Sequence, residues 1–150
     1  MLQAGDKAPD FTATTTTGDQ ISLGDYLGKS SVVLYFYPKD DTPGCTHQAC
    51  EFRDSKAEYE AASVVVLGVS TDDQGSHQAF TEKYSLNFPL LVDSDGKLCD
   101  LFGVPRRGVY AARITFLIDP QGIIRKVWED VNVVGHAADV ISEVEALGHS

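Results

Sequence analysis

Apolar residues follow two patterns that alternate along the chain. Continuous runs of β-branched, leucine and aromatic residues over Ser31–Tyr37 and Val64–Ser70 predict strands that are covered on both faces of a sheet. Between them, from Cys45 to about Ala62, apolar positions recur at spacings of three and four and predict a helix. Its mostly apolar face is expected to consist of Cys45, Ala49, Phe52, Lys56 and Tyr59.

The remaining elements are shorter. A threonine-rich segment and a Gly-Asp turn predict an N-terminal β-hairpin of Phe11–Thr17 and Gln20–Leu23. Further helices are expected at Ser76–Tyr84, Lys97–Phe102 and Ala137–Leu147, and further strands at Leu90–Val92, Arg113–Ile118 and Ile123–Glu129. Strand–helix–strand followed by strand–strand–helix predicts one α/β domain over residues 1–150, with a mixed central sheet flanked by helices, as in thioredoxin-like folds.

Composition removes several classes of function. Twelve Lys and Arg against 22 Asp and Glu give a net charge of −10, which argues against a nucleic-acid partner. No apolar run approaches the roughly 20 residues of a membrane span, and no targeting leader opens the chain. Three cysteines cannot form a fully paired disulfide framework, so intracellular thiol chemistry and a cytoplasmic location are expected.

One segment, Tyr37–Asp54, lies where a buried strand ends and a helix begins, the usual place for chemistry in an open α/β sheet. Cys45 falls in the first helical turn, where unpaired N–H groups and the positive end of the helix dipole favour a thiolate. Gly44 allows a ligand to approach the backbone, and Thr42 can direct a hydroxyl into the same space. The alternative is an inert, buried cysteine, which the Pro-Gly-Cys junction disfavours.

At this point the chain resembles a known family. Pro38, Thr42 and Cys45 match the peroxiredoxin signature of proline, any three residues, threonine, any two residues and cysteine. A second cysteine, Cys50, followed by Phe-Arg-Asp, is similar to the peroxiredoxin Q (bacterioferritin comigratory protein) branch. Two outlying segments, Gly5–Phe11 and Arg113–Asp119, are similar to that branch as well, so that the resemblance spans nearly the whole chain.

The resemblance implies a thiol peroxidase that reduces hydrogen peroxide and organic hydroperoxides. Cys45 attacks the O–O bond, becomes a sulfenic acid and releases water or an alcohol. Thr42 hydrogen-bonds the peroxide, and Arg113 supports the thiolate and the leaving oxygen. Pro38 shields the pocket, and the N–H groups of Gly44 and Cys45 hold the developing charge. No metal or cofactor is required, the reductant is thioredoxin or a similar thiol protein, and a monomer is favoured over a dimer.

The resemblance also implies that Cys50 resolves the sulfenic acid as an intramolecular disulfide. In a regular helix, Cα atoms five residues apart are separated by about 8.5 Å, beyond the limit of about 7 Å for a disulfide. The first turns of the helix must therefore unwind before Cys45 and Cys50 can bond. Alternatively, Cys50 only fills the helix. Cys99 is interpreted as a structural thiol, with a resolving or regulatory role as its alternative.

Two other functions use the same cysteine. A thioredoxin-like disulfide oxidoreductase needs Cys-x-x-Cys at the helix start and a proline before Thr115, whereas this chain has Thr42-Pro43-Gly44-Cys45 and Ile114. A peroxide sensor would pass its disulfide to a regulator protein, and the sequence does not separate a sensor from an enzyme.

The remaining polar residues receive plain structural interpretations. A solvent-facing position is expected for His47, Arg106 and Arg107, and loop positions for Asp40 and Asp41. A solvated helix face is expected for Glu51, Asp54, Glu58 and Glu60. The segment Val104–Tyr110 departs from the family pattern, which leaves the shape of the pocket rim open.

Overall fold

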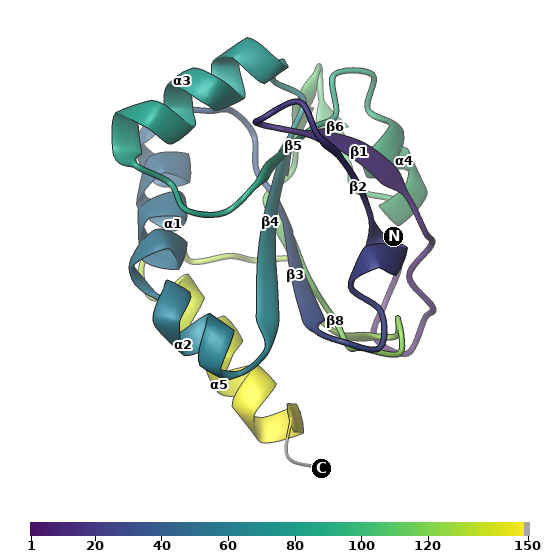
Figure 1. The fold of residues 1–150 in the computed structure, drawn as a ribbon. Coiled ribbons are helices and arrows are strands. Elements are labelled where there is room, and N and C mark those ends of the chain that lie inside the picture. The colour runs from purple at the N-terminus through teal and green to yellow at the C-terminus, as the bar shows by residue number, and fades with distance from the viewer. Residues whose placement is uncertain (149–150) are drawn as a thin grey trace.

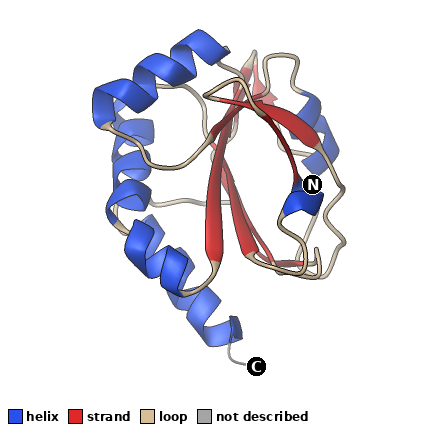
Figure 2. Cartoon of the chain, viewed as in Figure 1, coloured by secondary structure: helices blue, strands red, loops and turns tan. Residues whose placement is uncertain are grey.

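The computed structural model of the chain describes residues 1–148, so the last two residues of the predicted domain lie outside the described residues. A seven-stranded mixed sheet forms its centre (Figures 1 and 2). The strands are β1 (Thr12–Thr15), β2 (Gln20–Ser22), β3 (Ser31–Phe36), β4 (Val64–Ser70), β5 (Leu90–Val92), β8 (Ile114–Ile118) and β9 (Ile124–Trp128). Their spatial order is β2-β1-β5-β4-β3-β8-β9. The central β3, β4 and β5 are parallel, and the outer strands pair antiparallel.

Helices cover both faces of this sheet. Figure 1 shows α1 (Pro43–Asp54), α2 (Lys56–Ala61), α3 (Gln74–Tyr84) and α5 (His136–Gly148) along one side, and α4 (Lys97–Phe102) on the other. Within residues 1–148, no helix has the length and apolar character that a membrane span requires.

The side chains of β3 alternate between the two faces and so contribute to two cores. Val33, Tyr35 and Tyr37 enter the core beneath α1, α3 and α5, whereas Val32, Leu34 and Phe36 enter the core beneath α4. The predictions of a mixed sheet flanked by helices and of an N-terminal hairpin are thus confirmed.

The single helix predicted from Cys45 to Ala62 is wrong in one respect. The chain forms two helices there, because Ser55, with φ −96° and ψ 7°, leaves the helical conformation between α1 and α2. Serine is a weak helix former because its hydroxyl competes for backbone hydrogen bonds. Tyr59 still reaches the core, but Lys56 lies at the surface and donates to the carbonyl of Asn87.

Two features of the fold position the site. Pro43 occupies the first helical position of α1, where its missing N–H costs nothing, so the helix begins two residues before Cys45. The antiparallel register of β3 and β8 pairs Phe36 with Ile114, which brings Arg113 beside the loop that follows β3. A small hairpin of β6 (Arg106–Arg107) and β7 (Tyr110–Ala111), which the sequence did not predict, leads into Arg113.

Candidate active site

Cys45 lies in the first turn of α1 and is only 2% exposed. Thr42 is the N-cap residue, but its side chain does not cap the helix. The N–H groups of Gly44 and Cys45 belong to the first turn, which has no intrahelical acceptors for them. Two backbone donors at the positive end of the helix dipole are therefore available next to the thiol.

Arg113 connects β8 to the start of α1. Its Nη2 donates to Cys45 Sγ at 3.4 Å, and its Nη1 donates to Gln48 Oε1 at 2.8 Å. A guanidinium that donates to sulfur stabilises negative charge on it. Gly44 leaves room for this contact, because a Cβ atom at that position would lie 3.2 Å from Arg113 Nη2.

Gln48 is the site residue that the sequence analysis missed. It is fully buried, and its Oε1 fixes the orientation of the Arg113 guanidinium. A signal for it existed, since Gln48 follows Cys45 by three residues and places a polar group on the otherwise apolar face of α1. The pairing with Arg113 itself spans 65 positions and has no local signal.

The Thr42 hydroxyl donates its proton to the Lys39 carbonyl at 2.8 Å. Because a hydroxyl has one proton and two lone pairs, its oxygen remains an acceptor for the O–H of a hydroperoxide. Thr42, Pro38 and Arg113 line one pocket, together with Lys39, Arg107, Tyr110, Ala111 and Ala112. The pocket thus combines an apolar wall with cationic groups, and the hydrogen bond of Arg113 links it to Cys45.

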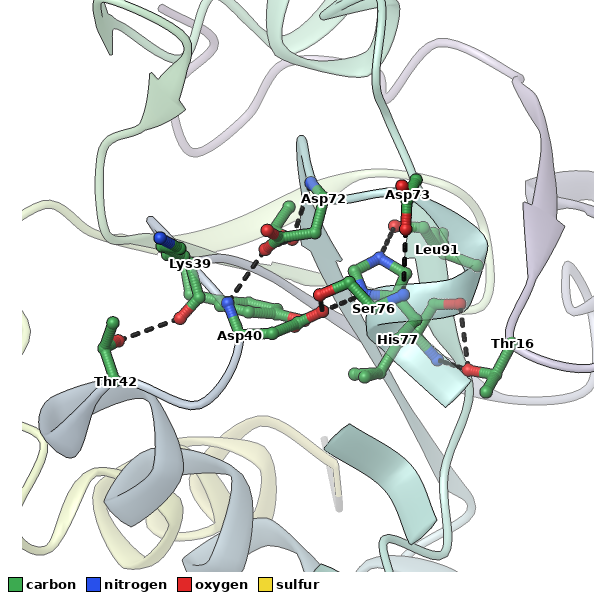
Figure 3. Close-up of polar contacts among 12 residues, drawn as sticks. Thr16, Lys39, Asp40, Thr42, Asp72, Asp73, Ser76, His77 and Leu91 are labelled. Carbon is green, nitrogen blue, oxygen red and sulfur yellow. Dashed lines mark hydrogen bonds and ion pairs between the residues drawn. The ribbon is translucent and has the colours of Figure 1, made fainter. Parts of the chain in front are cut away.

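The two aspartates of the loop differ more than the sequence indicated. Asp41 is exposed, adopts a left-handed conformation with φ 59°, and accepts hydrogen bonds from Lys83 and Tyr84, each at 2.8 Å. The hydrogen bond from Lys83 lowers the pKa of Asp41. Asp40 is 6% exposed and faces Ser76 and His77 (Figure 3). Both aspartates therefore attach the loop to α3.

The three cysteines are unpaired. Cys50 is half-buried on the intact α1, so the regular helix separates it from Cys45. Cys99 is fully buried in α4, and burial raises the pKa of its thiol to about 12. A thiol that is buried and protonated fits the interpretation of Cys99 as a structural residue.

Glu51 was predicted on a solvated helix face, and this is wrong. Its carboxylate accepts from the N–H groups of Gly135 at 2.8 Å and Ala137 at 3.4 Å, at the start of α5. Although partial burial opposes it, these hydrogen bonds and one with His47 lower the pKa of Glu51. The sequence does not show which helix start lies opposite α1. His47 is exposed, as expected.

Comparisons with known proteins agree with this geometry. Residues 4–127 match the model of the AhpC/TSA family. A putative peroxiredoxin bcp of Coxiella burnetii is 47% identical, over 95% of this chain and 99% of that protein. The crystal structure of peroxidoxin BcpB from Mycobacterium tuberculosis superposes with a TM-score of 0.93 at 32% identity, and covers 98% of this chain and 99% of that one.

A third relative is known with a trapped intermediate. The bacterioferritin comigratory protein of Xanthomonas campestris, described for its alkyl peroxide reduction activity, has a TM-score of 0.87 at 34% identity, with 92% of each chain covered. The similarity to these structures confirms the predicted thioredoxin-like fold. The chain therefore belongs to the AhpC/TSA family and, within it, to the peroxiredoxin Q (Bcp) branch.

Proposed function

We propose that Cys45 is the peroxidatic residue of this chain, which as a peroxiredoxin is a thiol peroxidase. The observation that carries the assignment is the hydrogen bond from Arg113 to Cys45 Sγ at the start of α1. It joins a buried sulfur to a pocket that Thr42 and Pro38 line. The same arrangement supports substrate-binding roles for Thr42, Arg113 and the N–H groups of Gly44 and Cys45, and a shielding role for Pro38.

In this mechanism the Cys45 thiolate attacks one peroxide oxygen. An S–O bond forms while the O–O bond breaks, so that sulfur is oxidised to a sulfenic acid and the second oxygen leaves with the electron pair. That oxygen takes up a proton and departs as water or an alcohol. Thr42 accepts a hydrogen bond from the peroxide O–H, while Arg113 and the N–H groups of Gly44 and Cys45 stabilise the charge that develops. In this proposal the side chains and backbone N–H groups supply the chemistry without a cofactor.

Cys50 is proposed to resolve the sulfenic acid. After the start of α1 unwinds, the Cys50 thiolate attacks Cys45 Sγ. The S–S bond forms as the S–O bond breaks, and the oxygen leaves as hydroxide, which takes up a proton to become water. The distribution of contacts along α1 supports this. Phe52 stacks on Tyr35 with ring centroids 4.8 Å apart, and Arg53 donates to the Tyr84 carbonyl at 2.6 Å. These attachments lie beyond Cys50. Before Cys50, Cys45 and Gln48 accept hydrogen bonds from Arg113, which must be released on unwinding, and no side chain caps the beginning of the helix.

The substrates are proposed to be hydrogen peroxide and organic hydroperoxides. Tyr110, Ala111 and Ala112 provide an apolar wall for an alkyl group, and the Xanthomonas relative was studied for alkyl peroxide reduction. Thioredoxin or a similar thiol protein is proposed as the reductant. We further propose that the chain forms a single domain and is a monomer, with a dimer as the alternative. A cytoplasmic location is also proposed, and the free thiols support it.

A coupled turnover assay tests the function and separates it from its rivals. Reduced protein, thioredoxin, thioredoxin reductase and NADPH are mixed with hydrogen peroxide, and NADPH consumption is followed. Continuous turnover that Cys45→Ser abolishes and Cys99→Ser retains supports the peroxidase. A single stoichiometric oxidation without turnover supports the sensor. Reduction of insulin disulfides would instead identify a disulfide oxidoreductase.

A further inference from the structure

A buried polar cluster lies behind the peroxide-binding loop. We define the Asp40–His77 cluster as Tyr37, Asp40, Asp72, Ser76 and His77, which come from the end of β3, the loops after β3 and β4, and α3. Figure 3 shows the Asp40 and His77 side chains directed toward one another. His77 is fully buried, and the peroxidase mechanism above makes no use of it.

Both ring nitrogens of His77 face acceptors. Nδ1 lies 2.7 Å from Asp40 Oδ2, and Nε2 lies 2.8 Å from the Leu91 carbonyl (Figure 3). A neutral imidazole has one N–H and satisfies only one of these acceptors, whereas an imidazolium satisfies both. Burial by itself would lower the pKa of His77, but the hydrogen bond and the charge of Asp40 raise it.

The Asp40 carboxylate is equally committed. Its Oδ1 accepts from the Tyr37 hydroxyl at 2.5 Å, and its Oδ2 accepts from Ser76 Oγ at 2.8 Å as well as from His77. Three donors therefore converge on it, and the 2.7 Å contact with His77 Nδ1 has the geometry of a carboxylate–imidazolium pair. Ligand atoms of Asp40, Asp72 and His77 lie within 4.8 Å of one another, as in a metal site. Hydrogen bonds already occupy these ligand atoms: His77 Nδ1 donates to Asp40, and the Asp40 N–H donates to Asp72. A cation bound here would have to displace the proton on His77 Nδ1.

One peptide unit connects this ion pair to the active site. The N–H of Asp40 donates to Asp72 Oδ2 at 2.8 Å, and the carbonyl of the same peptide, that of Lys39, accepts from the Thr42 hydroxyl at 2.8 Å. A peptide unit is planar, so its two ends move together. The orientation of this plane therefore decides where the Thr42 proton points and which lone pair it leaves for a peroxide.

We propose that His77, held as an imidazolium, is a positioning residue for peroxide reduction: it fixes Asp40, and with it the peptide that orients the Thr42 hydroxyl. The inference rests on the role proposed for Thr42. Among the described residues, His77 hydrogen-bonds neither to Cys45 nor to a residue that lines the pocket, so it acts through the loop.

A dependence on pH follows from this arrangement. The titratable groups that face His77 are Asp40 and Asp72 from the two loops and Tyr37 from the end of β3, while β5 contributes only the Leu91 carbonyl. Burial keeps the pKa of Tyr37 well above its ordinary value, so its hydroxyl remains a donor. Because the pKa of His77 is raised, the positioning is fully present below the ordinary value of 6.5 and is lost as the pH rises through the raised pKa.

The test compares two reactions of Cys45 as a function of pH. The rate constant for oxidation by hydrogen peroxide depends on the orientation of Thr42, whereas alkylation by iodoacetamide depends only on the thiolate and its access. Both are measured at Cys45 by peptide mass spectrometry, in the wild type, His77→Gln, Ser76→Ala, Thr42→Val and the double variant of His77 and Thr42.

For His77→Gln we expect peroxide oxidation to slow about 10- to 100-fold at neutral pH while alkylation is unchanged, because misplacement of a reacting group by about 1 Å costs that much. The ratio of the two wild-type rates is expected to fall at alkaline pH and to be flat in His77→Gln. In the Thr42→Val background, His77→Gln is expected to have no further effect.

Ser76→Ala removes one donor to Asp40 at a half-buried position and is expected to slow oxidation severalfold, which keeps the test decisive if His77→Gln does not fold. An unchanged peroxide rate in these variants, equal slowing of alkylation, or additive effects with Thr42→Val would overturn the inference. A wild type that reacts with peroxide no faster than free cysteine would overturn the proposed function itself.

Discussion

Replacement of Arg113 by methionine separates two ways in which a guanidinium can assist Cys45. The substitution keeps an unbranched side chain but removes the donors to Cys45 Sγ and to Gln48 Oε1. If Arg113 acted only on thiolate formation, the loss would have a ceiling. An ordinary thiol is about 3% ionised at neutral pH, so the largest loss through the thiolate fraction is about 30-fold.

A donor to the oxygen that leaves contributes more than this. Removal of one such preorganised donor typically costs about 10²- to 10³-fold in rate. We therefore expect Arg113→Met to slow oxidation of Cys45 by about 10²- to 10³-fold and the deficit to persist at alkaline pH, where a loss confined to thiolate formation would disappear.

Stopped-flow fluorescence of Trp128 under excess hydrogen peroxide measures this rate constant across pH. Arg125→Met is the matched control, because Arg125 pairs with Asp119 at the exposed edge of the sheet and contacts no site residue among those described. Urea unfolding checks the variants, since Gln48 becomes a buried acceptor without its partner at a cost of about 1–3 kcal/mol. Recovery of the wild-type rate at alkaline pH would refute the role of Arg113 beyond the thiolate.

Three further predictions follow from single contacts. Gly44→Ala places a Cβ atom 3.2 Å from Arg113 Nη2 and is expected to slow peroxide oxidation about tenfold; an unchanged rate would mean that Arg113 has room to move. Glu51→Gln is expected to lower the free energy of unfolding by about 0.5 kcal/mol at neutral pH, through the N-terminus of α5. Because the pKa of Glu51 is lowered, this difference is present above the ordinary value of 4.5 and disappears in urea titrations at more acidic pH. Cys99→Ser is expected to retain peroxidase turnover while it lowers the urea midpoint, because a hydroxyl replaces a fully buried thiol; loss of turnover in a folded variant would contradict this.

Local patterns predicted most of the elements. The bounds of β4, β5 and α4 agree residue for residue with the expectation, because turn-forming residues flank each segment on both sides. The break at Ser55 was missed, since one serine within a periodic segment is a weak signal against a helix.

The candidate site was predictable where a local motif carries it. Pro38, Thr42 and Cys45 lie within eight residues and come together through one turn. The partners of this motif come from distant segments: Gln48 meets Arg113, and Asp40 meets His77 on α3. These contacts depend on strand order and register, which a hydropathy pattern does not determine. For the same reason Glu51 was assigned to solvent although it caps α5.

The central claim, that Cys45 reduces the peroxide, is tested most directly by one oxidation. Fully reduced protein is mixed with one equivalent of hydrogen peroxide, free thiols are counted over time, and disulfides are mapped by peptide mass spectrometry. The account predicts rapid loss of two thiols, a disulfide between Cys45 and Cys50, and a free Cys99. Retention of all three thiols, with a reaction no faster than that of free cysteine, would contradict it.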